Sequence, residues 1–149
     1  GPLMAPATFR RIYKPRMQRL VEFLKKRTKA RVYLHSCGSI YRMIPDLIEI
    51  GIEVLNPVQV NAAEMDSARL KKEFGKDLTF WGGGCDPVVL QTGTPKDVGE
   101  DVKRRIHDLA PGGGFVFGSI HNIQANVPPE NIVAMFDAAL ELGGYPIAV

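Results

Sequence analysis

The sequence predicts an α/β fold in which a leading helix is followed by four parallel strand–helix units. Short runs of β-branched and aromatic residues alternate with segments in which apolar residues recur every three or four positions. Glycine or proline lies at most of the boundaries between them. Strands that alternate with helices form a parallel sheet, because each helix carries the chain back to the start of the next strand.

The predicted elements follow one another without a linker. The strands are the short β-rich runs, and they cover residues 31–35, 52–56, 77–81 and 114–118. The helices show the helical period, and they cover residues 7–28, 40–50, 62–74, 95–109 and 129–142. Gly51 and Gly75 are suited to end two of these helices, and Thr94-Pro95 is a typical helix start. The composition does not change along the chain, so we expect residues 1–149 to form one domain.

The length limits what these units form. A closed barrel of eight strand–helix units needs about 250 residues, and this chain of 149 residues has four units. It therefore supplies half of a TIM-type (β/α)8 barrel. Either the other strands lie in sequence outside this chain, or two copies associate as a homodimer, since a half-barrel leaves strand edges open. An open, doubly wound sheet is the alternative, but no Gly-x-Gly-x-x-Gly motif opens a helix.

Composition argues against several classes of protein. The hydrophobic share of 45% and the charged share of 23% suit a soluble globular domain, and no apolar run approaches the ~20 residues of a membrane span. Residues 1–6 lack the basic and apolar regions of a signal peptide. We therefore expect a cytoplasmic protein whose two cysteines are free thiols or metal ligands.

The net charge of +3 is mild, and the basic residues gather in the first thirty positions. No aromatic stacking platform or Gly-rich RNA motif accompanies them. This pattern favours a solvated helix face, and we expect no nucleic-acid partner.

The candidate site residues lie where the predicted strands end. Ligands of parallel β/α folds bind at these carboxyl ends. We expect substrate or cofactor contacts from residues in the loops that follow the strands, namely Asn56, Gln59, Gly83, Asp86, Asn122 and Gln124. Gly83 belongs to a Gly82–Gly84 run that either lets a ligand approach the backbone or meets a steric need. His107 lies in a predicted helix, and we expect an ordinary surface residue there.

Three strand-end residues predict a transition-metal site, with zinc as the metal. Alternation places His35 and Cys37 on the same side of an extended chain, and Gly38 lets the backbone turn away after them. His121 follows the fourth strand as the third ligand, and Cys85, after the third strand, is a fourth ligand or a neighbour. Three protein ligands and one open position are typical of catalytic zinc. The alternatives are a buried strand end without metal, and a Cys37 nucleophile paired with His35 or His121.

Short motifs along nearly the whole chain resemble those of a known family. They are Tyr13-Lys-Pro15, His35-Ser-Cys-Gly-Ser39, Pro45-Asp-Leu-Ile-Glu-Ile-Gly51, Leu55-Asn-Pro-Val-Gln59, Lys71-Lys-Glu-Phe-Gly75, Phe80-Trp-Gly-Gly-Gly84 and Pro129-Glu-Asn-Ile132. In this order they resemble the C-terminal half of the uroporphyrinogen decarboxylase superfamily, and within it the branch of corrinoid-dependent methyltransferases. The resemblance implies the last four units of a (β/α)8 barrel.

The resemblance also implies a metal site and an activity. In the methyltransferase branch, zinc is held by a His-x-Cys pair and by a later cysteine ten residues before the asparagine of a helix start. Asn131 matches this asparagine, and ten residues earlier the chain has His121 in place of cysteine. Such an enzyme moves a methyl group between a corrinoid, carried by a partner protein, and a thiol or related acceptor.

Two alternatives to methyl transfer stay open. The first is the decarboxylase itself, which uses no metal and has its key Asp and Arg mainly in the N-terminal half. The second is a non-catalytic half-barrel that serves only to assemble with another half.

Overall fold

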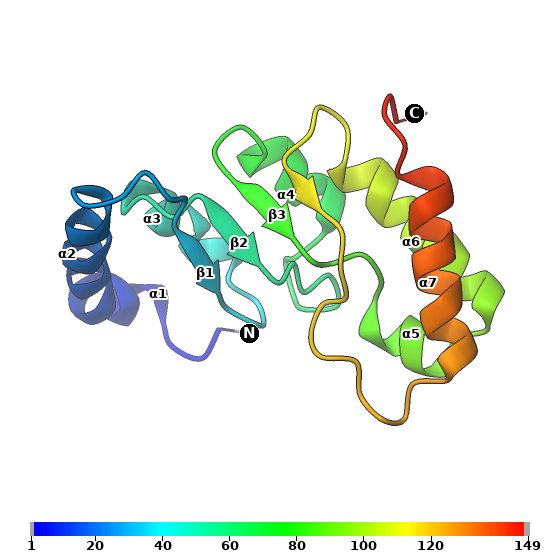
Figure 1. The fold of residues 1–149 in the computed structure, drawn as a ribbon. Helices are drawn as coiled ribbons and strands as arrows, with labels where there is room; N and C mark the ends of the chain where they lie inside the picture. The colour runs from blue at the N-terminus through cyan, green and yellow to red at the C-terminus, as the bar shows by residue number, and fades with distance from the viewer. Residues whose placement is uncertain (1, 148–149) are drawn as a thin grey trace.

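A computed structural model describes residues 2–147 and confirms the parallel α/β fold. Four strands form one sheet in the order β1-β2-β3-β4, and each pairs in parallel with the next (Figure 1). The strands are β1 (Tyr33–His35), β2 (Val54–Asn56), β3 (Thr79–Trp81) and β4 (Phe115–Val116). Their order rises steadily, as in a barrel, whereas a doubly wound sheet reverses its order at a switch point. The sheet is therefore consistent with part of a TIM-type barrel.

Helices precede, connect and follow these strands. Their bounds are α1 (Pro6–Thr8), a π-helical turn (Phe9–Tyr13), α2 (Lys14–Lys25), a 3-10 turn (Tyr41–Met43), α3 (Ile44–Glu49), α4 (Ser67–Phe74), α5 (Pro87–Thr92), α6 (Pro95–Leu109) and α7 (Pro129–Leu142). None of those within residues 2–147 is both long and apolar enough to cross a membrane. Gly1, the first residue of the N-terminal segment considered above, lies outside the described residues.

Local capping explains where the helices match or differ from the prediction. The predicted helix over 95–109 is confirmed, because Thr94 and Asp97 form a reciprocal capping box around Pro95. The helix predicted from residue 62 begins later, because the Asp66 side chain accepts a hydrogen bond from the Arg69 N–H and so sets the start at Ser67. Helix α5 has no counterpart in the prediction, since its six residues are too few to show a helical period.

The two faces of the sheet differ in what covers them. Leu34, Leu55 and Phe80 are in register across β1 to β3, and they pack with residues of α2, α3 and α4 in one hydrophobic cluster. Full burial of a side chain such as Phe80 contributes about 2 kcal/mol to folding. A second cluster joins α5, α6 and α7. On the opposite face Tyr33 and Trp81 stay exposed, with their rings edge to face at 5.5 Å.

Candidate metal centre

The centre begins where β1 ends. His35 is the last residue of the strand, and the backbone turns at Gly38, whose φ of +85° favours glycine. This short extended stretch leaves the Cys37 Sγ 3.3 Å from the His35 Nε2. Zinc bond lengths of about 2.1 Å to nitrogen and 2.3 Å to sulfur place two tetrahedral ligand atoms about 3.5 Å apart. The observed distance is close to that value, and it is also that of a hydrogen bond between the thiol and the imidazole, so the geometry of the pair is compatible with a shared metal ion.

The loop after β4 brings the third residue. The His121 ring lies 6.1 Å from the His35 ring, centroid to centroid, although the two residues are far apart in the sequence. The nitrogen and sulfur ligand atoms of His35, Cys37 and His121 all lie within 4.8 Å of one another, and all three residues are exposed. Among the described residues, these three form the one group of histidine, cysteine and acidic residues that converges in this way. Two imidazoles and one thiol fit the ligand preferences of zinc.

Asn56 fixes which nitrogen of His35 is free. The Asn56 Nδ2 donates to the backbone carbonyl of Trp81 at 3.1 Å, so the Asn56 Oδ1 faces the other way. That oxygen lies 2.7 Å from the His35 Nδ1, and because an amide oxygen only accepts, the Nδ1 must carry the proton. The His35 Nε2 then has its lone pair available, on the side of Cys37. This is the arrangement that supports a metal-bound histidine through its outer nitrogen.

Gln59 supports the same turn from β2. Its Oε1 accepts a hydrogen bond from the Gly38 N–H at 2.7 Å and holds the chain in place just after Cys37. Gln59 also borders two cavities that meet at Cys37. One is about 500 Å³ and reaches toward Phe9 and Met17, and the other is about 370 Å³ and contains His121. The centre therefore lies between two spaces large enough for small ligands.

Cys85 lies in a different environment, although it also follows a strand. It is 1% exposed, and its thiol donates to the Asp86 carbonyl. Burial, followed by the nearby Asp101 carboxylate, raises the pKa of the Cys85 thiol to about 12. Cys85 is outside the group formed by His35, Cys37 and His121, although it borders the smaller cavity.

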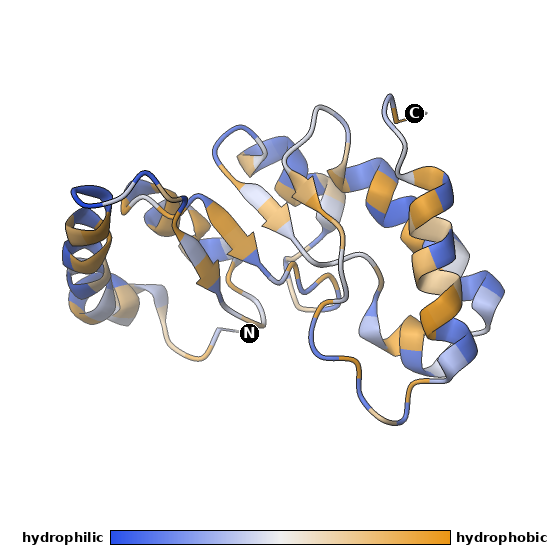
Figure 2. Cartoon of the chain, viewed as in Figure 1, coloured by the Kyte–Doolittle hydropathy of each residue, from blue (hydrophilic) through white to orange (hydrophobic). Residues whose placement is uncertain are grey.

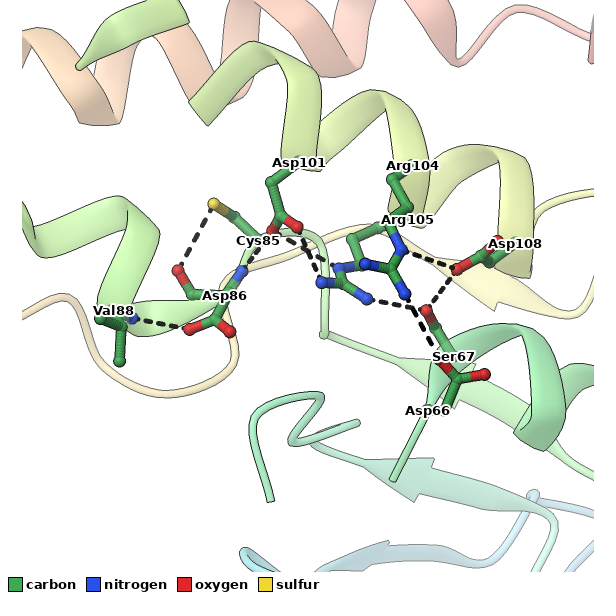
Figure 3. Close-up of polar contacts among 9 residues, drawn as sticks. All are labelled: Asp66, Ser67, Cys85, Asp86, Val88, Asp101, Arg104, Arg105 and Asp108. Carbon is green, nitrogen blue, oxygen red and sulfur yellow. Dashed lines mark hydrogen bonds and ion pairs between the residues drawn. The ribbon is translucent and has the colours of Figure 1, made fainter. Parts of the chain in front are cut away.

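A charged network holds the loop that carries Cys85 (Figure 3). The Asp101 carboxylate accepts from the Asp86 N–H at 2.6 Å and from the Arg105 guanidinium at 2.7 Å. Arg105 also donates to the Ser67 hydroxyl, which in turn donates to Asp108. The network thus ties α4 and α6 to the loop after β3, and Cys85 in that loop packs into the hydrophobic cluster of α5, α6 and α7.

The other predicted site residues take several roles. Gly83 has a φ of +82°, and a Cβ there would lie 2.8 Å from the Val58 side chain, so a close approach within the fold already requires this glycine. Asp86 caps α5 by accepting from the Val88 N–H. Asn122 and Gln124 lie in the loop of His121, where the Gln124 side chain donates to the Asn122 carbonyl.

Sequence reasoning missed Gln91 and Ser119, which border the smaller cavity. Gln91 lies on α5, a helix too short to be predicted, and no local motif marks it. Ser119 directly follows the fourth predicted strand, two residues before His121. That position was the only sign in the sequence that Ser119 could belong to the site. Its hydroxyl donates to the His121 carbonyl at 2.7 Å.

Comparison with known proteins supports the resemblance at the level of the family. The family model for uroporphyrinogen decarboxylase (URO-D) matches residues 1–142. The uroporphyrinogen decarboxylase of Neisseria meningitidis serogroup C is 25% identical over 147 residues, which are 95% of this chain and 39% of that protein. That of Alkalilimnicola ehrlichii is 40% identical over 60 residues, which are 40% of this chain and 16% of that protein.

These relatives bear on the alternatives as well. The chain spans well under half the length of the curated relatives that it matches. These relatives are named uroporphyrinogen decarboxylase, which fits the decarboxylase alternative better than the corrinoid-dependent methyltransferase. The comparisons do not show that the chain belongs to the methyltransferase branch. The match of the family model over most of the sequence shows that the chain belongs to the uroporphyrinogen decarboxylase family.

Proposed function

We propose that this chain carries the metal centre of a zinc-dependent methyltransferase within the uroporphyrinogen decarboxylase family. The observation that supports it is the convergence of His35, Cys37 and His121 from two distant loops at the carboxyl end of the sheet. Three protein ligands leave a fourth position for a ligand. Bound zinc would lower the pKa of a thiol in that position, and this favours the thiolate needed to accept a methyl group from a corrinoid on a partner protein.

The residues around the centre have defined tasks in this proposal. Asn56 orients His35 so that its Nε2 lone pair faces the metal position. Gln59 holds the turn at Gly38 and so keeps Cys37 in reach of His35. The two cavities give the acceptor and the methyl-carrying group separate approaches to Cys37.

Metal analysis of the purified chain tests this proposal. We expect zinc near one per chain, and its loss in the His35→Ala/Cys37→Ala double variant. His107→Ala is the matched control, because His107 is an exposed histidine on α6 outside the metal-binding group, and it should keep its zinc. A folded wild-type chain without zinc, or a double variant that retains it, contradicts the proposal.

Uroporphyrinogen decarboxylation is the second candidate, and the names of the relatives favour it. Metal dependence separates the two candidates, because the family resemblance implies that the decarboxylase uses no metal, whereas the methyltransferase needs zinc. The chain, alone and together with any N-terminal half that completes its barrel, is assayed for decarboxylation of uroporphyrinogen and for transfer of a methyl group from a methyl-corrinoid to a thiol. Decarboxylation that is insensitive to chelators and to Cys37→Ala favours the second candidate. Thiol methylation that is lost with zinc favours the first.

The open edges of the sheet support a proposal about assembly. Helices α2 and α7 carry exposed hydrophobic residues, Leu20, Phe23 and Leu24 on α2 and Val133, Phe136 and Leu140 on α7. Both helices show hydrophobic stretches, drawn in orange, between hydrophilic ones (Figure 2). Helix α2 is rich in lysine and arginine, whereas residues 129–147 contain three acidic residues and no lysine or arginine. We propose that a second copy occupies these faces, because two-fold symmetry places the basic helix of each copy beside the acidic helix of the other.

Sedimentation of the chain measures this association. We expect a dimer that dissociates when Phe136→Lys or Leu140→Lys removes an apolar contact and adds repulsion to α2. Val88→Lys is the control, since Val88 is an exposed apolar residue on α5, away from both terminal helices. A monomer at all concentrations contradicts the proposal, and a monomer that binds a separately expressed N-terminal half shows that this half is the natural occupant.

A further inference from the structure

The glycine run after β3, Gly82–Gly84, pairs with the segment that leads to His121. The Gly82 N–H donates to the Val116 carbonyl at 2.9 Å. The Gly84 N–H donates to the Gly118 carbonyl, also at 2.9 Å. The two segments therefore continue side by side beyond the ends of β3 and β4, to a point just before the third candidate ligand.

A side chain at Gly84 would collide with that segment. A Cβ at this position would lie 2.4 Å from the Phe117 Cε2 and 2.9 Å from the Gly118 carbonyl oxygen. Nonbonded carbon atoms rest about 3.5 Å apart, so the ring would have to move by about 1 Å. Rotation of the Phe117 ring is restricted, because it packs edge to face against Phe115 and Phe136. The added carbon would therefore push the backbone of residues 117–118 away from the loop after β3.

The link from this segment to His121 is short and held in place. Ile120 is 5% exposed, and the Ser119 hydroxyl donates to the His121 carbonyl at 2.7 Å. A displacement at Gly118 is therefore passed on to His121 and is not absorbed by a long loop. The residues of a metal site must be held within about 0.5 Å of the productive geometry, and the displacement expected from a Cβ is about twice that.

Gly82 lies at the same junction, on the side of β2. A Cβ there would lie 3.0 Å from the Ser119 carbonyl oxygen and 3.4 Å from the Asn56 Nδ2. Ser119 belongs to the loop of His121, and Asn56 accepts the hydrogen bond that orients His35. The glycine run thus lies in close contact with residues that support both histidines of the centre.

We infer that Gly84 is a positioning residue of the metal centre, because the lack of a side chain there lets the loop after β4 approach closely enough for His121 to meet His35 and Cys37. This inference rests on the proposed function, since it concerns the third ligand of that centre. The sequence left the glycine run with two explanations, approach of a ligand or a steric need. The contacts favour a steric need that serves the site.

A double-mutant cycle on zinc affinity tests the inference. Gly84→Ala and His121→Ala are made singly and together, and competition with a chromophoric chelator measures each affinity. The φ of Gly84 is not positive, so alanine acts there through its close contacts alone. Gly84→Ala should lower the affinity at least tenfold, as loss of a residue that supports a ligand does. In the His121→Ala background, where that ligand is already lost, it should have no further effect.

A matched control separates this contact from any added methyl group. Gly99→Ala places the same group on α6, where no heavy atom of the described residues beyond its own helix lies within 4 Å, and it should leave the zinc affinity unchanged. Thermal unfolding of the metal-free variants checks that each is folded. If Gly84→Ala does not fold, the cycle is run in a Phe117→Leu background. There the added carbon still meets the Gly118 carbonyl, and we expect a smaller loss that again requires His121.

Two outcomes overturn the inference. The first is an unchanged zinc affinity in Gly84→Ala. The second is an equal loss with and without His121, because general loosening of the fold would lower both affinities by the same factor. Failure of the proposed function reads differently: the wild-type chain would not bind zinc, or His121→Ala would bind it as tightly as the wild type, and the inference would fall with it.

Discussion

Cys37 and Cys85 occupy equivalent places, each in the loop after a strand of the same parallel sheet, yet their surroundings are opposite. Cys37 is exposed and lies 3.3 Å from an imidazole nitrogen. Cys85 is buried beneath α5 and α6, where loss of solvent raises the pKa of its thiol to about 12. The strand end alone therefore does not decide whether a cysteine is accessible to a metal ion. What packs over the loop decides whether the thiol is accessible or part of the core.

The largest expected effect is on metal binding. Cys37→Ser should lower the affinity for zinc by more than about 100-fold. Loss of a residue that only supports a metal ligand lowers the affinity by up to about 100-fold, and loss of a ligand itself should cost more. Cys85→Ala should leave the affinity unchanged, because Cys85 is outside the metal-binding group. Competition with a chromophoric chelator measures both constants. Equal losses in the two variants would remove the distinction between the two cysteines.

The network under Cys85 should control stability. Arg105→Met leaves the Asp101 carboxylate without its buried partner, and such a loss costs about 3 kcal/mol of unfolding free energy. Arg104→Met is the matched control, since Arg104 is 58% exposed and its ion pairs are longer, at 3.4 and 3.8 Å. An exposed pair contributes less than about 1 kcal/mol. Urea unfolding of both variants gives the difference, and similar midpoints would show that the network does not hold this region.

The hydrogen bond that orients His35 should have an effect of intermediate size. Asn56→Leu keeps the branching of the side chain but removes the acceptor for the His35 Nδ1 proton, together with the donor to the Trp81 carbonyl. Loss of such a partner typically lowers metal affinity 10- to 100-fold. The chelator competition used for Cys37→Ser measures it, with thermal unfolding as the check that the variant is folded. An unchanged zinc affinity would show that Asn56 does not orient the ligand.

Much of the fold and of the candidate centre was predictable because local patterns encode it. The alternation of elements predicted the parallel sheet, and the His-x-Cys spacing placed His35 and Cys37 on one side of the chain. The position of His121 after the last strand was enough to bring it to the same edge. The environment of Cys85 was not predictable, because it depends on the packing of α5 and on the Asp101–Arg105 pair, which are contacts between distant parts of the sequence.

The smallest effect expected is a dependence of stability on pH that belongs to Cys85. Its pKa is raised to about 12 in the folded state, from an ordinary value of 9.0, so above pH 9 the unfolded thiol loses its proton while the folded thiol keeps it. The unfolded state then binds fewer protons, and the free energy of unfolding falls as the pH rises. Between pH 8 and pH 10 this amounts to about 1.4 kcal/mol. Lysines and tyrosines titrate in the same range, so the comparison is with Cys85→Ala, which should lose less stability over that interval. Parallel curves for the two proteins would mean that the Cys85 thiol ionises as easily in the folded chain as in the unfolded one, and the contrast with Cys37 would then be one of exposure alone.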